Sequence, residues 1–118
     1  MTADQIQEIV DIQGYLDCHY DSGNPAELLS RLTDLNVYLA RTADILPFAE
    51  EEWNTKKGEV ARAHKSETAT MLRYIIDEKT ALEARFYRHV ERINAAIVHQ
   101  IDAIRTQLSY VKMTMQLK

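Results

Sequence analysis

Residues 68–117 contain neither glycine nor proline, and this uninterrupted run constrains the fold most. Its large apolar side chains recur at steps of three or four residues, the spacing of one face of an α-helix. Leu82, Ile93 and Ile104 follow one another at 11 residues, so the stripe stays on one side of a nearly straight helix. We predict a long helix over 67–117 whose stripe is an oligomer seam. The seam consists of Leu82, Phe86, Val90, Ile93, Ile97, Ile101, Ile104, Leu108, Val111 and Met115.

The same run also contains a signal for a helix start. Thr80 and Glu83 have the spacing of a capping box, a motif that marks the first turn of a helix. Lys79 falls in line with the apolar stripe, and a charge at that position favours a local interruption. Two alternatives therefore stay open: one continuous helix, or a break at 77–80.

A second helix is predicted over 25–62. Asn24 suits an N-cap and Pro25 suits the first helical position. Leucines then follow at helical spacing: Leu28, Leu32, Leu35, Leu39 and Leu46. Pro47 removes one backbone hydrogen bond, so we expect a kink near it, with the apolar side resuming beyond. The polar residues 62–68 are expected to form the turn to the third segment.

The N-terminal residues 2–20 are predicted to form a short helix. Thr2 and Gln5 have capping-box spacing, and Gly14 is a weak point. The long helix would be roughly 75 Å long, whereas a compact chain of this size has a radius of gyration of about 13–14 Å. We therefore expect an all-α fold in one domain over 1–118: an elongated antiparallel helical hairpin with a short N-terminal helix.

Two long helices leave apolar surface uncovered, and the short helix cannot cover a rod of this length. The simplest remedy is self-association into an oligomeric helical bundle. The chain itself is therefore the first partner that the sequence predicts.

The composition favours a cytoplasmic protein. One cysteine, Cys18, cannot form an internal disulfide and fits a reducing compartment. The apolar runs are only a few residues long, and Met1–Gln5 lacks the basic region of a signal peptide. We expect no membrane partner.

Motifs for metal, cofactor or catalytic chemistry do not stand out. The four histidines form no Glu-x-x-His or His-x-x-x-His pair, and no glycine-rich phosphate loop or Gly-x-Ser-x-Gly occurs. His99 and Asp102 are three residues apart and fit an exposed helix pair. We expect a protein that is not an enzyme and has no metal or cofactor.

Charge is distributed unevenly along a chain of formal net charge −4. Residues 1–23 carry acidic side chains and no Lys or Arg, whereas basic side chains dominate residues 85–118. At about 100° per residue, one side of the last helix, opposite the seam, gathers basic groups. These are Arg85, Arg88, His89, Arg92 and His99. They predict either an interface for an anionic partner, or a solvated face that pairs with the acidic N-terminal helix of this chain or a neighbour.

The stretch Ile101-Asp102-Ala103-Ile104-Arg105-Thr106-Gln107-Leu108-Ser109-Tyr110-Val111-Lys112 ends the last helix. It resembles the end of a long helix in small helical proteins of tailed phages and prophages, over about Arg88 to Met115. The resemblance implies a protein made in the cytoplasm of an infected bacterium, with genes for single-strand annealing and replication nearby. It transfers no catalytic or binding residue. Asp102 and Arg105 also share one flank, where an ion pair between chains would set the register.

These observations together predict a non-enzymatic oligomeric binding protein. Our leading hypothesis is a phage accessory factor in DNA replication or recombination, with a nucleic-acid or protein partner. One alternative is an anti-defence protein that sequesters a nucleotide ligand or a host protein. Another is a purely structural oligomer.

Overall fold

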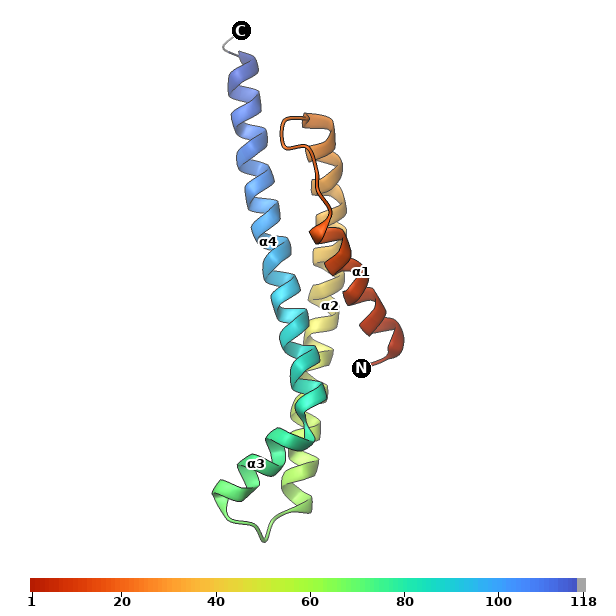
Figure 1. Cartoon of the computed structure of the whole chain (residues 1–118), viewed down its shortest axis with the longest axis vertical. Helices are drawn as coiled ribbons and strands as arrows, with labels where there is room; N and C mark the ends of the chain where they lie inside the picture. The colour runs from red at the N-terminus through yellow and green to blue at the C-terminus, as the bar shows by residue number, and fades with distance from the viewer. Residues whose placement is uncertain (117–118) are drawn as a thin grey trace.

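The computed structural model describes residues 1–116, which form four helices and, within that range, no strand. The helices are α1 (Ala3–Asp17), α2 (Pro25–Ala63), α3 (Ala69–Lys79) and α4 (Ala81–Gln116). The all-α prediction is confirmed. The molecule extends over 74 × 27 × 19 Å with a radius of gyration of 20.0 Å, so the predicted elongated shape is confirmed too (Figure 1). Residue 117, the predicted helix end, and Lys118 lie outside the described residues.

The long helices α2 and α4 run antiparallel and form the predicted hairpin (Figure 1). Their facing sides supply most of the core, and each large apolar side chain buried there contributes about 1.5–3 kcal/mol. From α2 these residues are Leu28, Leu35, Ile45 and Ala49. From α4 they are Phe86, Val90, Ile93, Ile97, Ile101 and Ile104. Six of the ten predicted seam residues are thus buried within a single chain.

The two ends of the predicted stripe are not buried within the single chain. Leu108 and Val111 are half-buried, whereas Leu82 is 64% exposed and Met115 is 67% exposed. Near the start of α4 the buried side chains are Thr80, which precedes the helix, and Ala84. Met115 lies beside Pro25, the first residue of α2, so α2 has no further turn to cover it.

Helix α1 packs against both long helices through buried Ile9, Ile12 and Leu16. Its start is the predicted capping box: the backbone N–H groups of Thr2 and Gln5 donate to each other's side chains, both at 3.1 Å. The helix continues through Gly14 and ends at Asp17, three residues before the predicted end at residue 20.

The C-terminal end of α1 is held by a buried guanidinium that sequence analysis missed. Arg31 of α2 is 5% exposed and donates to the Leu16 carbonyl at 3.3 Å and to Gln100 Oε1 of α4 at 2.9 Å. Gln100 donates to the same carbonyl at 3.0 Å. The guanidinium carbon lies 4.2 Å from the ring centroid of Tyr15 and 4.8 Å from that of Tyr20. Three helices are therefore joined at one point.

Helix α2 begins as predicted and continues through its internal proline. The Asn24 side chain accepts from the N–H groups of Ala26 and Glu27, at 3.0 and 3.3 Å. Pro47 is exposed and lies inside an α-helix that runs on to Ala63. The proline therefore neither ends the helix nor reverses the chain.

Of the two alternatives for the last segment, the structure contains the break. Helix α3 ends at Lys79, α4 begins at Ala81, and α3 leaves the rod at an angle (Figure 1). The hydroxyl of Thr80 donates to the Ile76 carbonyl at 2.8 Å and accepts from the Trp53 indole N–H at 3.2 Å. The bend is therefore tied to α2 by a tertiary hydrogen bond.

Candidate nucleic-acid interface at the helix bend

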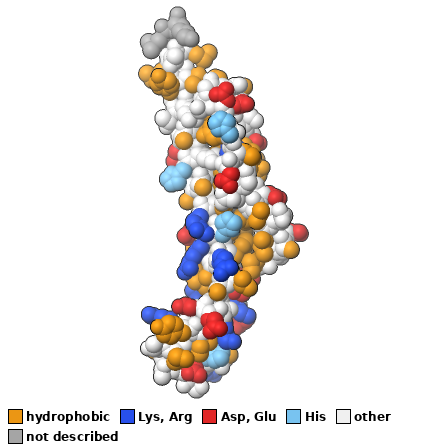
Figure 2. Space-filling model, viewed as in Figure 1, with side chains coloured by type: hydrophobic (Ala, Val, Ile, Leu, Met, Phe, Trp, Pro, Cys, Tyr) orange, Lys and Arg blue, Asp and Glu red, His pale blue; other side chains and the backbone are white. Residues whose placement is uncertain are grey.

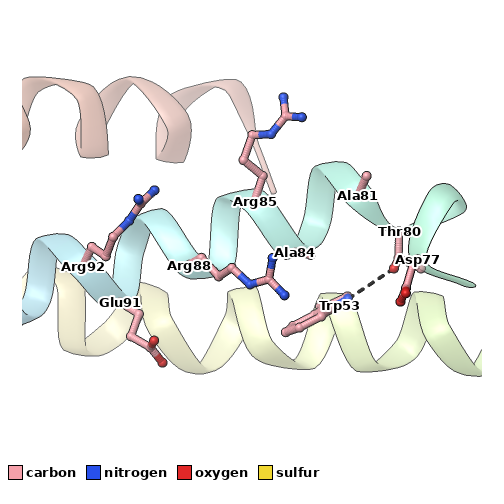
Figure 3. Close-up of a pocket in the computed structure, with 9 residues that line it drawn as sticks. All are labelled: Trp53, Asp77, Thr80, Ala81, Ala84, Arg85, Arg88, Glu91 and Arg92. Carbon is pink, nitrogen blue, oxygen red and sulfur yellow. Dashed lines mark hydrogen bonds between the residues drawn. The ribbon is translucent and has the colours of Figure 1, made fainter.

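A hollow of about 790 Å³ lies where α2, α3 and α4 meet. Arg85, Arg88 and Arg92 line it from α4, Trp53 lines it from α2, and Asp77 lines it from α3 (Figure 3). We call this site the basic hollow. Its remaining lining residues are Thr80, Ala81, Ala84 and Glu91. Lys and Arg side chains also gather on one part of the surface in Figure 2, beside hydrophobic side chains.

Trp53, in the basic hollow, has interaction partners on several sides. Its indole N–H donates to Thr80, and its ring lies 5.5 Å from the ring of Tyr87, centroid to centroid. The Lys57 ammonium lies 4.0 Å from the Trp53 ring centroid, and the Arg88 guanidinium carbon lies 5.6 Å from it. Both distances are within the range of cation–π attraction. The Trp53 ring therefore attracts the Lys57 and Arg88 side chains without neutralising their charges.

The three arginines do not converge on one point. Arg88 reaches toward Trp53, whereas Arg85 and Arg92 point away from the ring (Figure 3). Along α4 their spacing of three and four residues corresponds to about 4.5 and 6 Å. The backbone positions of the three arginines therefore span about 10 Å along α4, and their guanidinium groups diverge instead of forming a single cluster.

Carboxylates lie near the three arginines of the basic hollow. Within residues 1–116, however, no ion pair involves Arg85, Arg88 or Arg92. The neighbouring Glu91 carboxylate, with partial desolvation and the charge of Glu50, raises the pKa of Tyr87 above its ordinary value. The three guanidinium groups are therefore available to an external anion.

The acidic helix α1 is docked, but onto other partners. Glu8 forms a bidentate ion pair with Arg41 of α2, at 2.5 and 2.9 Å. The hydrogen bond from Arg41 holds the pKa of Glu8 below its usual value, although partial desolvation opposes the shift. In the part of the chain that the structure describes, no α1 carboxylate pairs with Arg85, Arg88 or Arg92. Pairing of the basic face with α1 of the same chain was therefore the wrong alternative.

The structure brings together three of the five residues predicted for the anionic face. His89 is half-buried and His99 is exposed, and neither lines the basic hollow. Sequence analysis missed Trp53, Asp77 and Glu91 as lining residues. If the break at Thr80 is assumed, the start of the last helix is known, and the pairing of the two long helices then brings Trp53 opposite Tyr87.

Residues 1–116 contain no group of three or more His, Cys, Asp or Glu side chains placed to hold a metal ion. Cys18 is exposed. No helix in this range combines the length and the apolar character needed to cross a bilayer.

Fold and site together define an all-α helical hairpin with a basic hollow at its bend. Comparisons with known proteins find no matching family model, no similar curated protein and no similar solved structure.

Proposed function

We propose that this chain is a non-enzymatic binding protein whose basic hollow holds the phosphate backbone of a single-stranded nucleic acid. One observation carries the proposal: Arg85, Arg88 and Arg92 line one hollow, and none of them forms an ion pair with a described side chain. Guanidinium groups bind phosphate oxygens through two parallel hydrogen bonds, which favours phosphate over a point-like anion.

The geometry favours an extended strand over a compact ligand. The guanidinium groups diverge along about 10 Å of α4, so consecutive phosphates of one strand match them better than a single phosphate group. Trp53 and Tyr87 add aromatic surface, and a stacked base contributes about 1–3 kcal/mol regardless of its identity. Three phosphate contacts per chain give weak, salt-sensitive binding.

For the wider role we propose an accessory factor in phage DNA replication or recombination. The resemblance of residues 101–112 to small helical phage proteins supports this role, and a weak sequence-tolerant strand binder suits it. The cellular process stays a prediction.

A second candidate is sequestration of a nucleotide, as in an anti-defence protein. The volume of about 790 Å³ supports it, because small-molecule sites fall at about 300–1,000 Å³. An extended strand is favoured over it, because the three guanidinium groups diverge instead of converging on one phosphate group (Figure 3).

The test is fluorescence anisotropy with a labelled single-stranded oligonucleotide of about 16 nucleotides. Arg88→Glu with Arg92→Glu should abolish binding at low salt and leave helicity unchanged, because both side chains are exposed. For single strands the plot of log K against log salt has a slope of about −0.7 per phosphate contact, so milder Arg→Gln changes at both positions should flatten it by about 1.4.

The matched control makes the same change of net charge elsewhere. Lys65→Glu with Arg73→Glu alters two exposed residues outside the basic hollow and should leave most of the binding intact. Equal loss in both double variants would reduce the effect to overall charge and contradict the site. Thermal stabilisation by a nucleotide without oligonucleotide binding would favour the second candidate.

A further inference from the structure

The basic hollow contains two carboxylates that phosphate binding does not use. Glu91 of α4 lies next to Tyr87 and raises the pKa of its hydroxyl. Asp77 of α3 lines the same hollow, is exposed and, within residues 1–116, forms no ion pair. Since a carboxylate repels phosphate, Asp77 is left for another part of a bound nucleotide.

The position of Asp77 indicates which part it faces. Figure 3 shows Arg88 and Asp77 on opposite sides of the Trp53 side chain. On one side, the Arg88 guanidinium carbon lies 5.6 Å from the Trp53 ring centroid. On the other, the Trp53 indole N–H donates to Thr80, three residues or about one helical turn after Asp77. A nucleotide whose phosphate binds Arg88 can therefore extend its base along Trp53 toward Asp77.

The chemistry of a carboxylate selects one base. An ionised carboxylate offers two acceptor oxygens and no donor. Guanine alone among the common bases has two neighbouring donors, N1–H and N2–H, on its Watson–Crick edge, and this edge is free in a single strand. Adenine, cytosine and thymine or uracil each place an acceptor beside their donor, so a carboxylate facing them meets a lone pair. A carboxylate therefore binds guanine through two parallel hydrogen bonds.

We propose that the basic hollow prefers guanine, and that the Asp77 carboxylate accepts from N1–H and N2–H of one guanine in the bound strand. This preference rests on the proposed strand binding and adds selectivity to it. The arginines of α4 hold the phosphates of any strand, whereas Asp77 of α3 discriminates between bases. The expected preference is about tenfold, the discrimination typical of one bidentate contact to a base.

Fluorescence anisotropy at low salt tests the preference with two labelled DNA strands of about 16 nucleotides. One strand contains only thymine, and the other carries isolated guanines among thymines, which prevents four-stranded guanine structures. The wild type should bind the second strand about tenfold more tightly. Asp77→Asn should reduce this ratio to about one, because an amide places a donor beside its acceptor. A general change of charge cancels, since the ratio compares two strands on the same variant.

Glu78→Gln is the matched control. Glu78 is the next residue of α3, is exposed and lies outside the lining of the basic hollow, so the variant loses the same charge on the same helix. It should keep the tenfold preference. Inosine retains N1–H and lacks the amino group of guanine, so a strand with inosine at the guanine positions should bind the wild type with intermediate affinity.

The outcomes separate the preference from strand binding itself. Equal binding of both strands by the wild type would refute the preference and leave strand binding standing. A tenfold ratio that persists in Asp77→Asn, or that Glu78→Gln loses as well, would overturn the role of Asp77. If neither strand binds the wild type, strand binding is wrong and the preference is wrong with it.

Discussion

At the scale of single residues, buried Arg31 is the most consequential side chain that sequence analysis missed. Its spacing from Leu28 and Leu35 puts it on the apolar side of α2, so the pattern alone indicated burial. Its partners were beyond reach of the pattern, because the Leu16 carbonyl and Gln100 come from two other helices. The apolar positions of α4 were easier, since periodicity alone locates Ile97 at the centre of the stripe.

Ile97→Asp should lower the free energy of unfolding by several kcal/mol. The side chain is fully buried, and an unpaired carboxylate there has no hydrogen-bond partner. Urea denaturation followed by circular dichroism measures the change. Met71→Asp on exposed α3 is the control and should shift stability by no more than about 0.5 kcal/mol. An unchanged midpoint for Ile97→Asp would show that the stripe is misassigned.

Tyr15 should make stability depend on alkaline pH. Desolvation and the hydrogen bond that its hydroxyl donates to Asp34, at 2.8 Å, raise the pKa of Tyr15 to about 12. Because the folded-state pKa exceeds the ordinary value of 10.0, this contribution is complete below pH 10 and disappears as the pH rises to about 12.

Urea midpoints of the wild type and Tyr15→Phe should therefore differ at pH 8 and approach each other above pH 10. Exposed Tyr74→Phe should follow the wild type throughout. A constant difference between the wild type and Tyr15→Phe up to pH 12 would refute the shifted titration.

At the scale of helices, the bend at Thr80 separates what spacing can and cannot predict. The capping-box spacing located the break, but the Thr80 hydroxyl bonds to Ile76 and Trp53 instead of capping α4. The hydrogen bond between Trp53 and Thr80 depends on how α2 packs against α4, and no local sequence pattern predicts that packing. Helix α3 has no buried residue, so it is the element that should open at the lowest free energy.

Pro47→Ala should be neutral or raise the free energy of unfolding, by up to about 3 kcal/mol. The proline is exposed inside a helix that continues on both sides, so alanine restores a backbone hydrogen bond without removing a buried contact. Thermal melting against a Val37→Ala control measures it. A clear loss of stability would mean that the backbone geometry imposed by Pro47 is needed for packing against α4.

At the scale of the whole molecule, the hairpin could be predicted because an apolar side chain recurs at nearly every turn of α4. The exposure of Leu82 and Met115, at the two ends of the apolar stripe, could not be predicted, since it depends on where α2 and the bend end. The basic hollow could be predicted only in part, because it too depends on how the helices pack. The spacing of Arg85, Arg88 and Arg92 in the sequence predicts that they share one face of a helix. Trp53 belongs to another helix, so no spacing within α4 predicts its place in the basic hollow.

The rod shape also determines how the molecule tumbles. A body of 74 × 27 × 19 Å rotates much more slowly about its two short axes than about its long axis. Amide N–H bonds in a helix lie nearly along the helix axis, so those of α2 and α4 point along the slow direction. Helix α3 leaves the rod at an angle (Figure 1), and its N–H bonds sample the faster rotation. Transverse nuclear spin relaxation is therefore fast and uniform along the two long helices and slower in α3, even if every helix is equally rigid.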